Sequence, residues 1–326
     1  MTGRRRSLRA LAAVIAGVCM PARGQTARRA ARIGLLHPAS AEGSAIYKAL
    51  IPGLAELGYV DGRNIVVETR SGHGKPEALA SLAAELVALK VEVLIVAGPA
   101  AVKAAIAATR TTPIVAIDLE SDPVANGWMK SLSRPGGNVT GFFLDLTGMS
   151  VKWLQLLREA VPSTREVSLL WDATSGTTQI NAVTNAASTF GIQVTTITIA
   201  DWKEFDAVLG ESARARMRAL IVLSSPTAFQ YSAQLAEFTA RHRIPAISPF
   251  RPFAEAGGLM SYGPNLDVFF RRTASTIDRI LAGGQASEVA VEQPTQYELV
   301  ANLKAAKMLG LTLPRSFLLR ADEVIQ

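Results

Sequence analysis

Residues 254–263 read Ala-Glu-Ala-Gly-Gly-Leu-Met-Ser-Tyr-Gly, and this stretch decides how the chain is divided. Before it, two sets of alternating strand and helix patterns follow one another, and after it come only a helix, a short connection and a second helix. These last elements are too few to bury a hydrophobic core of their own, so they must pack against what precedes them. We therefore expect two α/β lobes, with this stretch carrying the chain from one to the other and a ligand cleft between them.

Four short apolar runs, separated by helical patterns, make up the first set of elements. The runs span residues 32–37, 64–69, 91–97 and 113–119. The first connection predicts a helical stretch that Ser44 caps, that Pro52 interrupts and that Gly58 ends. Strands of this length that alternate with helices favour a parallel sheet with right-handed crossovers.

The second set repeats the alternation after a cluster of turn residues at 134–138. An extended segment at 139–146 is predicted to make the first crossing between the lobes. Further strands are expected at 167–171, 193–199, 219–224 and 244–248. Beyond residue 263 we expect a helix at 266–281, an extended segment at 289–293, and a last helix at 296–309 with Leu299, Leu303 and Ala306 on one face.

These patterns predict an α/β fold of two doubly wound parallel-sheet lobes joined by a hinge. Residues 33–142 with 263–289 are assigned to the first lobe, and residues 143–262 with 290–326 to the second. Residues 1–24 are assigned to neither. With 326 residues and 49% hydrophobic content, the chain is long enough for two domains of ordinary size.

The formal charge of +7 lies at the start of the chain rather than in its body. The first 32 residues contain eight arginines and no acidic residue, so the remainder has 26 Lys and Arg against 27 Asp and Glu. That remainder has a net charge of −1. A near-neutral body gives no electrostatic argument for DNA or RNA, and we expect no nucleic-acid partner.

The first 24 residues have the three parts of an export signal. A cationic start through Arg9 precedes the apolar stretch 10–20, and Ala22-Arg23-Gly24 supplies small residues for cleavage. An apolar stretch of eleven residues rises only ~16 Å as a helix, about half the thickness of a bilayer core. We therefore predict a cleaved signal and a periplasmic or other extracytoplasmic location.

Cys19 is the only cysteine, which makes lipid anchoring the alternative to simple cleavage. Val18 is bulkier than the small residue that lipoprotein processing prefers, so we favour simple cleavage. After cleavage past Gly24 no cysteine remains, which excludes disulfides and thiol chemistry in the exported protein. The pair Arg5-Arg6 leaves both general and twin-arginine export open.

Ligands of parallel α/β sheets bind outside the carboxyl ends of the strands, so the side chains there are candidates for a binding site. In the first lobe these are His37, Ser40, Gly98, Pro99, Ala100, Asp118 and Glu120. In the second lobe and the crossings they are Asp145, Trp171, Asp172, Ser224, Ser225, Phe250 and Tyr262. Aromatic faces mixed with hydroxyls and carboxylates are typical of a small-molecule pocket. Each side chain also has a structural explanation, as a cap or as part of the core.

The sequence contains no motif that commits it to catalysis. It lacks a Gly-x-Ser-x-Gly elbow, a His-Glu-x-x-His pair and a complete Gly-x-Gly-x-x-Gly turn, and its three histidines are scattered. We therefore expect no metal, no cofactor and no enzyme activity. An exported α/β enzyme that uses Asp118 or Glu120 as a base stays open as an alternative.

Several motifs, spread over nearly all of the chain after the leader, resemble a known family. They are 56–65 (ELGYVDGRNI), 122–124 (DPV), 134–141 (RPGGNVTG), 256–263 (AGGLMSYG), 291–295 (VEQPT), 302–307 (NLKAAK) and 309–311 (LGL). In combination they resemble the TrpX-like substrate-binding proteins of ABC transporters, within the type I periplasmic-binding-protein fold.

The resemblance implies a two-lobed binder that closes on its solute and presents it to a membrane permease. Hinges are then expected near 144–145, at Tyr262 and at 293–294. Some members of the family bind aromatic amino acids, so the solute is expected to be an aromatic or other amino acid. The protein itself is expected to be a monomer. A sensor lobe that signals occupancy to a membrane receptor stays open as a second alternative.

Overall fold

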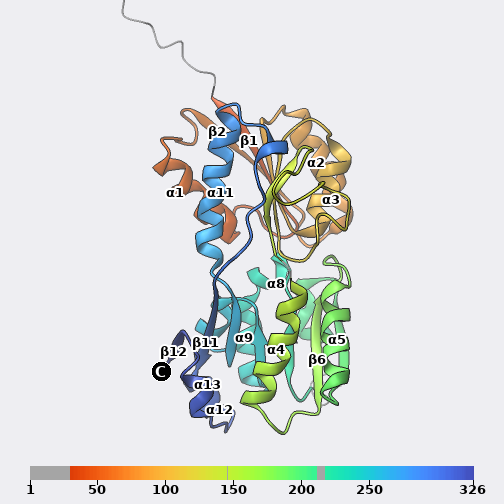
Figure 1. The fold of residues 1–326 in the computed structure, drawn as a ribbon, viewed down its shortest axis with the longest axis vertical. Helices are drawn as coiled ribbons and strands as arrows, with labels where there is room; N and C mark the ends of the chain where they lie inside the picture. Colours follow the sequence, from red (N-terminus) through yellow and green to blue (C-terminus); the bar gives the residue numbers. More distant parts are fainter. Residues whose placement is uncertain (1–29, 145, 211–216) are drawn as a thin grey trace, which may run out of the picture.

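The strands of this protein gather in two separate sheets. The structure is a computed structural model that describes residues 30–144, 146–210 and 217–326. One sheet occupies the upper half of Figure 1 and the other the lower half, each with helices packed on it. The predicted fold of two α/β lobes is therefore confirmed; we call the lobe built on the upper, five-stranded sheet the first lobe and the other the second lobe.

The sheet of the first lobe is entirely parallel, as predicted. Its strands are β1 (Ala31–His37), β2 (Ile65–Ser71), β3 (Val93–Ala97), β4 (Ile114–Asp118) and β5 (Val139–Phe143). They are arranged in the order β2-β1-β3-β4-β5. All residues of β3, β4 and β5 are buried, because helices cover both faces and the sequence supplies continuous apolar runs there.

Helices from both ends of the chain cover this sheet. They are α1 (Ala45–Glu56), α2 (Leu79–Ala88), α3 (Gly98–Ala108) and α11 (Leu266–Leu281), with single 3₁₀ turns η1 (Pro76–Ala78) and η3 (Ala286–Glu288). The Ser44 side chain accepts a hydrogen bond from the Tyr47 N–H and caps α1, as predicted. Helix α11 packs along α1 despite their separation in sequence (Figure 1), so the returning chain completes the first lobe.

The sheet of the second lobe has seven strands. They are β6 (Glu166–Asp172), β7 (Gln193–Ile199), β8 (Leu220–Val222), β9 (Ala246–Ser248), β10 (Met260–Pro264), β11 (Tyr297–Asn302) and β12 (Glu323–Ile325). Their order is β12-β11-β10-β9-β8-β6-β7. All neighbours are parallel except β10 and β11, which are antiparallel, because the chain returns from the first lobe in the opposite direction.

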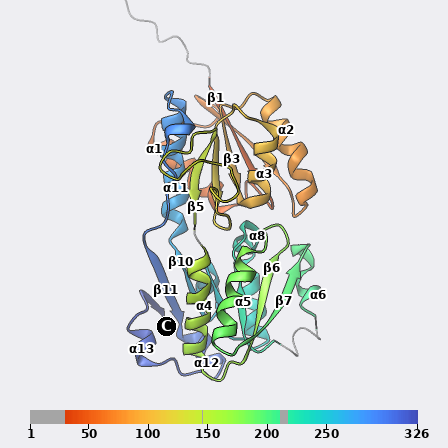
Figure 2. The same cartoon turned by 45° about the vertical axis from the view of Figure 1, so that its right-hand side comes forward.

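The helices of the second lobe lie on both faces of its sheet (Figure 2). They are α4 (Leu146–Ala160), α5 (Thr178–Thr189), α6 (Phe205–Val208), α8 (Pro226–Gln230), α9 (Ser232–Arg241), α10 (Arg251–Glu255), α12 (Leu303–Met308) and α13 (Arg315–Leu318), with the 3₁₀ turn η2 (Trp202–Glu204). The fully buried Trp153 of α4 donates its indole N–H to the carbonyl oxygen of Tyr262 at 2.8 Å. This bond fixes α4 against β10, next to a point where the chain leaves the lobe.

The chain passes between the two sheets three times. It leaves the first sheet after Phe143, leaves the second after Pro264, and returns to the second between Glu292 and Tyr297. The Glu292 N–H still donates to the Gly141 carbonyl at 2.9 Å, so the third connection runs beside the end of β5. The stretch 254–263 supplies most of β10 and leads directly into the second crossing.

The helix predicted at 296–309 is wrong over its first half. Residues Tyr297–Asn302 form β11, and only Leu303–Met308 are helical. The apolar spacing fits a helix, but β10 needs a partner for its backbone groups, and pairing with β11 supplies it. Asn302 marks the change, because its side chain accepts from the Ala305 N–H and caps α12.

Within the ranges that the structure describes, no helix is both long enough and apolar enough to cross a membrane.

Substituting Gly263 tests the packing of β10. A Cβ atom at this position would overlap the carbonyl oxygen of Pro249, a backbone atom that cannot move freely. We expect Gly263→Ala to lower the free energy of unfolding by about 1–3 kcal/mol, measured by urea titration. Gly137→Ala is the matched control, because a Cβ there meets nothing within 4 Å. Equal stability of the two variants would contradict the packing described.

Candidate functional site

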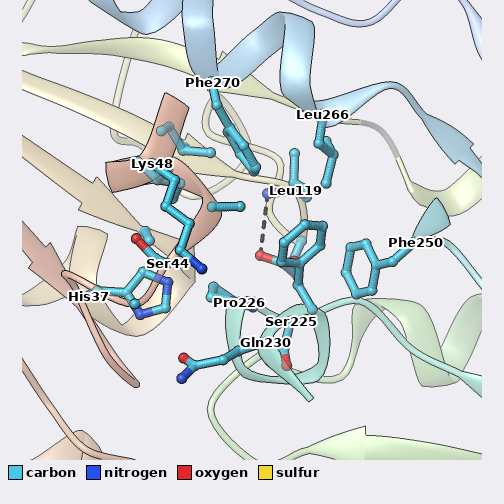
Figure 3. Close-up of a pocket in the computed structure, with 17 residues that line it drawn as sticks. His37, Ser44, Lys48, Leu119, Ser225, Pro226, Gln230, Phe250, Leu266 and Phe270 are labelled. Atoms are coloured by element: carbon cyan, nitrogen blue, oxygen red, sulfur yellow. Dashed lines mark hydrogen bonds between the residues drawn. The ribbon is translucent and has the colours of Figure 1, made fainter. Parts of the chain in front are cut away.

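A cavity of about 180 Å³ lies between the lobes, at the carboxyl ends of β1, β3 and β4. Its first-lobe wall comes from the end of β1, the start of α1, the end of β4 and the start of α11. Its second-lobe wall comes from α8 and from Phe250 (Figure 3). The volume exceeds the ~150 Å³ of an engineered cavity that admits benzene, so a small organic molecule fits.

Three phenylalanine rings form much of the apolar surface of this cavity. Phe229 of α8 packs edge-on against Phe250, with ring centroids 4.9 Å apart, and against Phe270 of α11, with centroids 5.9 Å apart. Phe270 belongs to the first lobe and the other two rings to the second. The aromatic contact therefore bridges the lobes and makes the two cores continuous at the cavity.

Two hydrogen bonds also join the lobes beside the cavity. The Ser224 hydroxyl donates to Glu120 Oε1 at 2.6 Å, and the Ser40 N–H donates to Gln230 Oε1 at 3.2 Å. Gln179 holds both backbone groups of Ser224, accepting from its N–H at 2.7 Å and donating to its carbonyl at 2.9 Å. The hydroxyl of Ser224 is therefore presented to Glu120 by a fixed backbone.

Gly98 permits a close approach between the lobes. It begins α3 with a φ of +75°, and a Cβ there would lie 2.6 Å from Cγ of Pro226, the first residue of α8. A side chain at this position would thus be strained and would also push α8 away from the first lobe. Together with the two hydrogen bonds, this contact shows that the structure is a closed arrangement of the lobes.

Glu120 and Asp118 form a buried pair of carboxyl groups. Glu120 lines the cavity, while Asp118 lies behind it and accepts the Glu120 N–H on Oδ1 at 2.9 Å. Burial raises the pKa of Asp118 to about 6. Burial, and then the nearby charge of Asp118, raise the pKa of Glu120 well above its ordinary value. The pair therefore holds a proton that either carboxyl alone in water would have lost.

His37 is the other buried titratable group at the cavity. It is 3% exposed, and burial lowers its pKa to about 4, so the ring is neutral at neutral pH. Its Nδ1 atom accepts the Ala39 N–H at 3.1 Å. A neutral imidazole carries a single proton, which this bond places on Nε2.

The cavity brings together four residues that the sequence placed at separate strand ends. They are His37, Glu120, Ser225 and Phe250. Ser225 mainly caps α8, since its hydroxyl accepts the Ala228 N–H at 2.8 Å. Four more predicted residues contact the lining without being part of it: Ser40, Gly98, Asp118 and Ser224. Ser40 faces an outer crevice between the lobes.

The remaining predicted residues do not line this cavity. Pro99 and Ala100 lie in the first turn of α3. Trp171 donates its indole N–H to the Gly176 carbonyl, Asp172 accepts from the indole of Trp202, and Tyr262 stacks on Tyr297. Asp145 lies outside the described residues.

Sequence reasoning missed the residues that helices contribute to the cavity. Ser44 and Lys48 of the first helix, Gln230 of α8 and Leu266 of α11 all line it. The prediction was limited to strand ends, yet the helix that follows each strand begins at the same edge of the sheet. The predicted cap at Ser44 was the available signal, because a capped helix start near a ligand cleft brings its first turn to that cleft.

The chemistry of the cavity is that of binding rather than of a metal centre. In the described part of the chain, no group of three or more His, Cys, Asp or Glu residues is placed to hold a metal ion. Apolar rings combined with one carboxyl pair, one neutral imidazole and one amine suit an organic molecule that is apolar on one side and polar on another.

Comparisons with known proteins agree with this arrangement. The family model described as ABC transporter substrate binding protein matches residues 33–325. A protein from Clostridioides difficile described as a tyrosine-binding protein is 22% identical over 283 residues, which are 85% of this chain and 80% of that protein.

Solved structures share the fold. One from Streptococcus pneumoniae, described as an ABC domain in complex with L-Trp, is 24% identical, with a TM-score of 0.79 over 91% of this chain and 100% of that one. The ligand-free, open structure of a Clostridium difficile substrate-binding protein with adhesive properties is 22% identical, with a TM-score of 0.59 over 91% of this chain and 99% of that one. At these identities the likeness shows the fold alone.

The buried carboxyl pair makes stability depend on pH. The folded protein holds the Asp118 proton more tightly than the unfolded chain, so the free energy of unfolding falls as pH rises from about 4 through about 6. We expect Asp118→Asn to remove about 1–3 kcal/mol of this fall, because each pKa unit corresponds to ~1.4 kcal/mol. Urea titrations of both proteins at pH 4.5 and 7.5 measure the difference. The variant also removes the charge that helps to raise the pKa of Glu120, so the difference reports on the carboxyl pair. Parallel pH profiles would contradict the assignment.

Proposed function

Since the chain belongs to the ABC transporter substrate-binding protein family and has the two-lobed type I periplasmic-binding-protein fold, we propose that it is the extracytoplasmic solute-binding component of an ABC importer. It captures a small molecule between its lobes and presents the closed complex to a permease in the membrane. The cavity between the lobes is the solute site.

The observation that supports this proposal is a cavity with walls from both lobes, which direct contacts between the lobes hold together. The Ser224–Glu120 bond, the Ser40–Gln230 bond and the packing of Pro226 on Gly98 all join different lobes. Each would separate if the lobes opened. A solute that touches both walls therefore favours the closed state by its differential affinity for that state.

We propose an amino acid as the solute, with an aromatic amino acid as the first candidate. The relative from Clostridioides difficile is named for tyrosine, and the Streptococcus pneumoniae structure contains L-Trp. Phe229, Phe250 and Phe270 give the apolar side chain of such a solute a surface to pack on. Glu120 is placed to accept its ammonium group, whose charge would draw the shared proton off the carboxyl pair.

The three crossings are the proposed hinges, near 144–145, 262–266 and 292–297. On this account the lobes move as units, and we propose the division into 33–142 with 263–289 and 143–262 with 290–326 as those units. Rotation about short connections between two intact cores is a common way for such proteins to close.

The remaining parts of the proposal concern location and partners. Residues 1–24 act as a cleaved export signal, with lipid attachment at Cys19 as the disfavoured route, and the mature protein works as a monomer in the periplasm. Its partners are the solute and the permease, and it binds no nucleic acid. We propose a binding role without enzyme activity, because the family model that matches describes substrate-binding proteins. Both oxygens of Glu120 accept hydrogen bonds within the protein, from Leu119 N–H at 3.2 Å (the dashed line in Figure 3) and from Ser224 Oγ.

A thermal-shift screen of the mature protein, from about Gln25, tests capture directly. The probes are amino acids, aromatic acids, sugars, nucleosides and polyamines. A solute at a hundred times its dissociation constant is expected to stabilise the folded state by ~2.7 kcal/mol and to be recovered unchanged after long incubation. Consumption of the solute would favour the enzyme alternative. If no class of probe stabilises the protein, solute capture is contradicted.

Gly98→Ala is expected to weaken binding of any solute found in that screen by about tenfold or more, because its Cβ keeps α8 from reaching the first lobe. Isothermal titration calorimetry measures the loss. Adding Pro226→Ala removes the Cγ and Cδ atoms that the new Cβ meets, so the double variant is expected to regain part of the affinity. If Gly98→Ala binds the solute with unchanged affinity, the packing of Pro226 on Gly98 is not part of the closed, solute-bound state.

A further inference from the structure

One end of the solute cavity carries several hydrogen-bond donors, and one of them is His37. The Nε2 atom carries the proton, because Nδ1 accepts from the Ala39 N–H. No partner for Nε2 is found among the described residues, although the side chain is 97% buried and lines the cavity. The Nε2 atom is not closed off by protein, and His37 lines the cavity, so an acceptor on a bound solute can reach it.

The first turn of α1 supplies two more donors. Ser44 accepts the Tyr47 N–H on its hydroxyl and the Lys48 N–H on its carbonyl. In the described part of the chain, the N–H groups of Ala45 and Ile46 have no acceptor, as is usual for the start of a helix. Both residues line the cavity, and the positive end of the helix dipole favours a negative charge there.

Lys48 adds a full positive charge to the same end. It stands one turn further along α1, lines the cavity, and makes no ion pair with any described carboxylate. In Figure 3, Lys48 and His37 lie together on one side of the cavity. Leu119, the neighbour of Glu120, and Phe250 lie on the other side.

We propose that this donor end (His37, Ala45, Ile46 and Lys48) binds a carboxylate group of the solute. A sugar hydroxyl could accept from His37, but it would gain nothing from the charge of Lys48 or from the helix dipole, whereas a carboxylate gains from both. His37 contributes as a neutral, oriented donor and selects a solute that reaches it. The inference rests on the proposed function and narrows the solute class to apolar carboxylic acids, with or without an amino group.

Matched probes on the wild-type protein separate the possibilities by isothermal titration calorimetry. The probes are L-phenylalanine and L-tryptophan, the corresponding amines phenethylamine and tryptamine, and the simple acids 3-phenylpropanoate and benzoate. At least one carboxylate-bearing probe is expected to bind, and its decarboxylated partner to bind about tenfold or more weakly. If an amino acid binds tightly and both simple acids bind weakly, the carboxylate belongs to an amino acid. If a simple acid binds tightly and the amino acids bind weakly, the solute is an organic acid without an amino group.

Two variants assign the effect to the donor end. His37→Phe keeps a ring but removes the donor, and is expected to lose about tenfold or more in affinity for the carboxylate probe. Lys48→Met is expected to lower the affinity for the carboxylate probe a fewfold. Lys103→Met, at an exposed position of α3, is expected to leave that affinity unchanged. Both Lys48 and Lys103 are exposed helix residues, so their variants should fold even if His37→Phe does not.

The inference is overturned if the amines bind as tightly as the acids, or if neither His37→Phe nor Lys48→Met changes the affinity for a carboxylate probe. It is also overturned if only sugars, nucleosides or polyamines bind, in which case solute capture stands and the carboxylate class is wrong. If no probe of any class binds, the proposed function itself fails.

Discussion

The contact between α8 and the first lobe is the constraint on which the site depends. This five-residue helix places Pro226 on Gly98 and Gln230 on the Ser40 N–H, and the residue before its cap, Ser224, donates to Glu120. Most of the second-lobe wall of the cavity belongs to the same short segment. The cavity therefore has walls from both lobes only while α8 packs against the first lobe. On the proposed function, solute recognition and lobe closure are the same physical event.

Much of the fold followed from hydrophobic patterning. Continuous apolar runs predicted buried parallel strands, and Ser44 and Gly58 predicted the two ends of α1. The interruption predicted at Pro52 is wrong, because α1 is helical from Ala45 to Glu56 with Pro52 inside it. A second failure lay at β11, where Leu299 has helical spacing to later apolar residues but pairs with Tyr262 across an antiparallel ladder. Local spacing cannot reveal that β10 lacks a partner until the returning chain arrives. The cap at Asn302 was the one local sign that the helix starts later than its pattern suggests.

The sequence predicted at which edge of the sheet the site lies, but not which side chains line it. His37, Glu120, Ser225 and Phe250 line the cavity because strand ends converge there. Trp171 and Tyr262 also stand at strand ends or crossings, but their rings are held by partners away from the cavity. Which side of a strand end faces the other lobe depends on how the lobes close, and the sequence of one strand carries no information on that. The helix-borne residues Ser44 and Lys48 required the same three-dimensional knowledge.

Small-angle X-ray scattering, with and without a saturating solute, tests the central claim most directly. If the solute binds both walls of the inter-lobe cavity, its addition is expected to lower the radius of gyration of the mature protein, because the open lobes swing together. The scattering of the complex should then match the closed arrangement of Figure 1. A solute that binds tightly while the radius of gyration stays at its ligand-free, more extended value would contradict capture by closure.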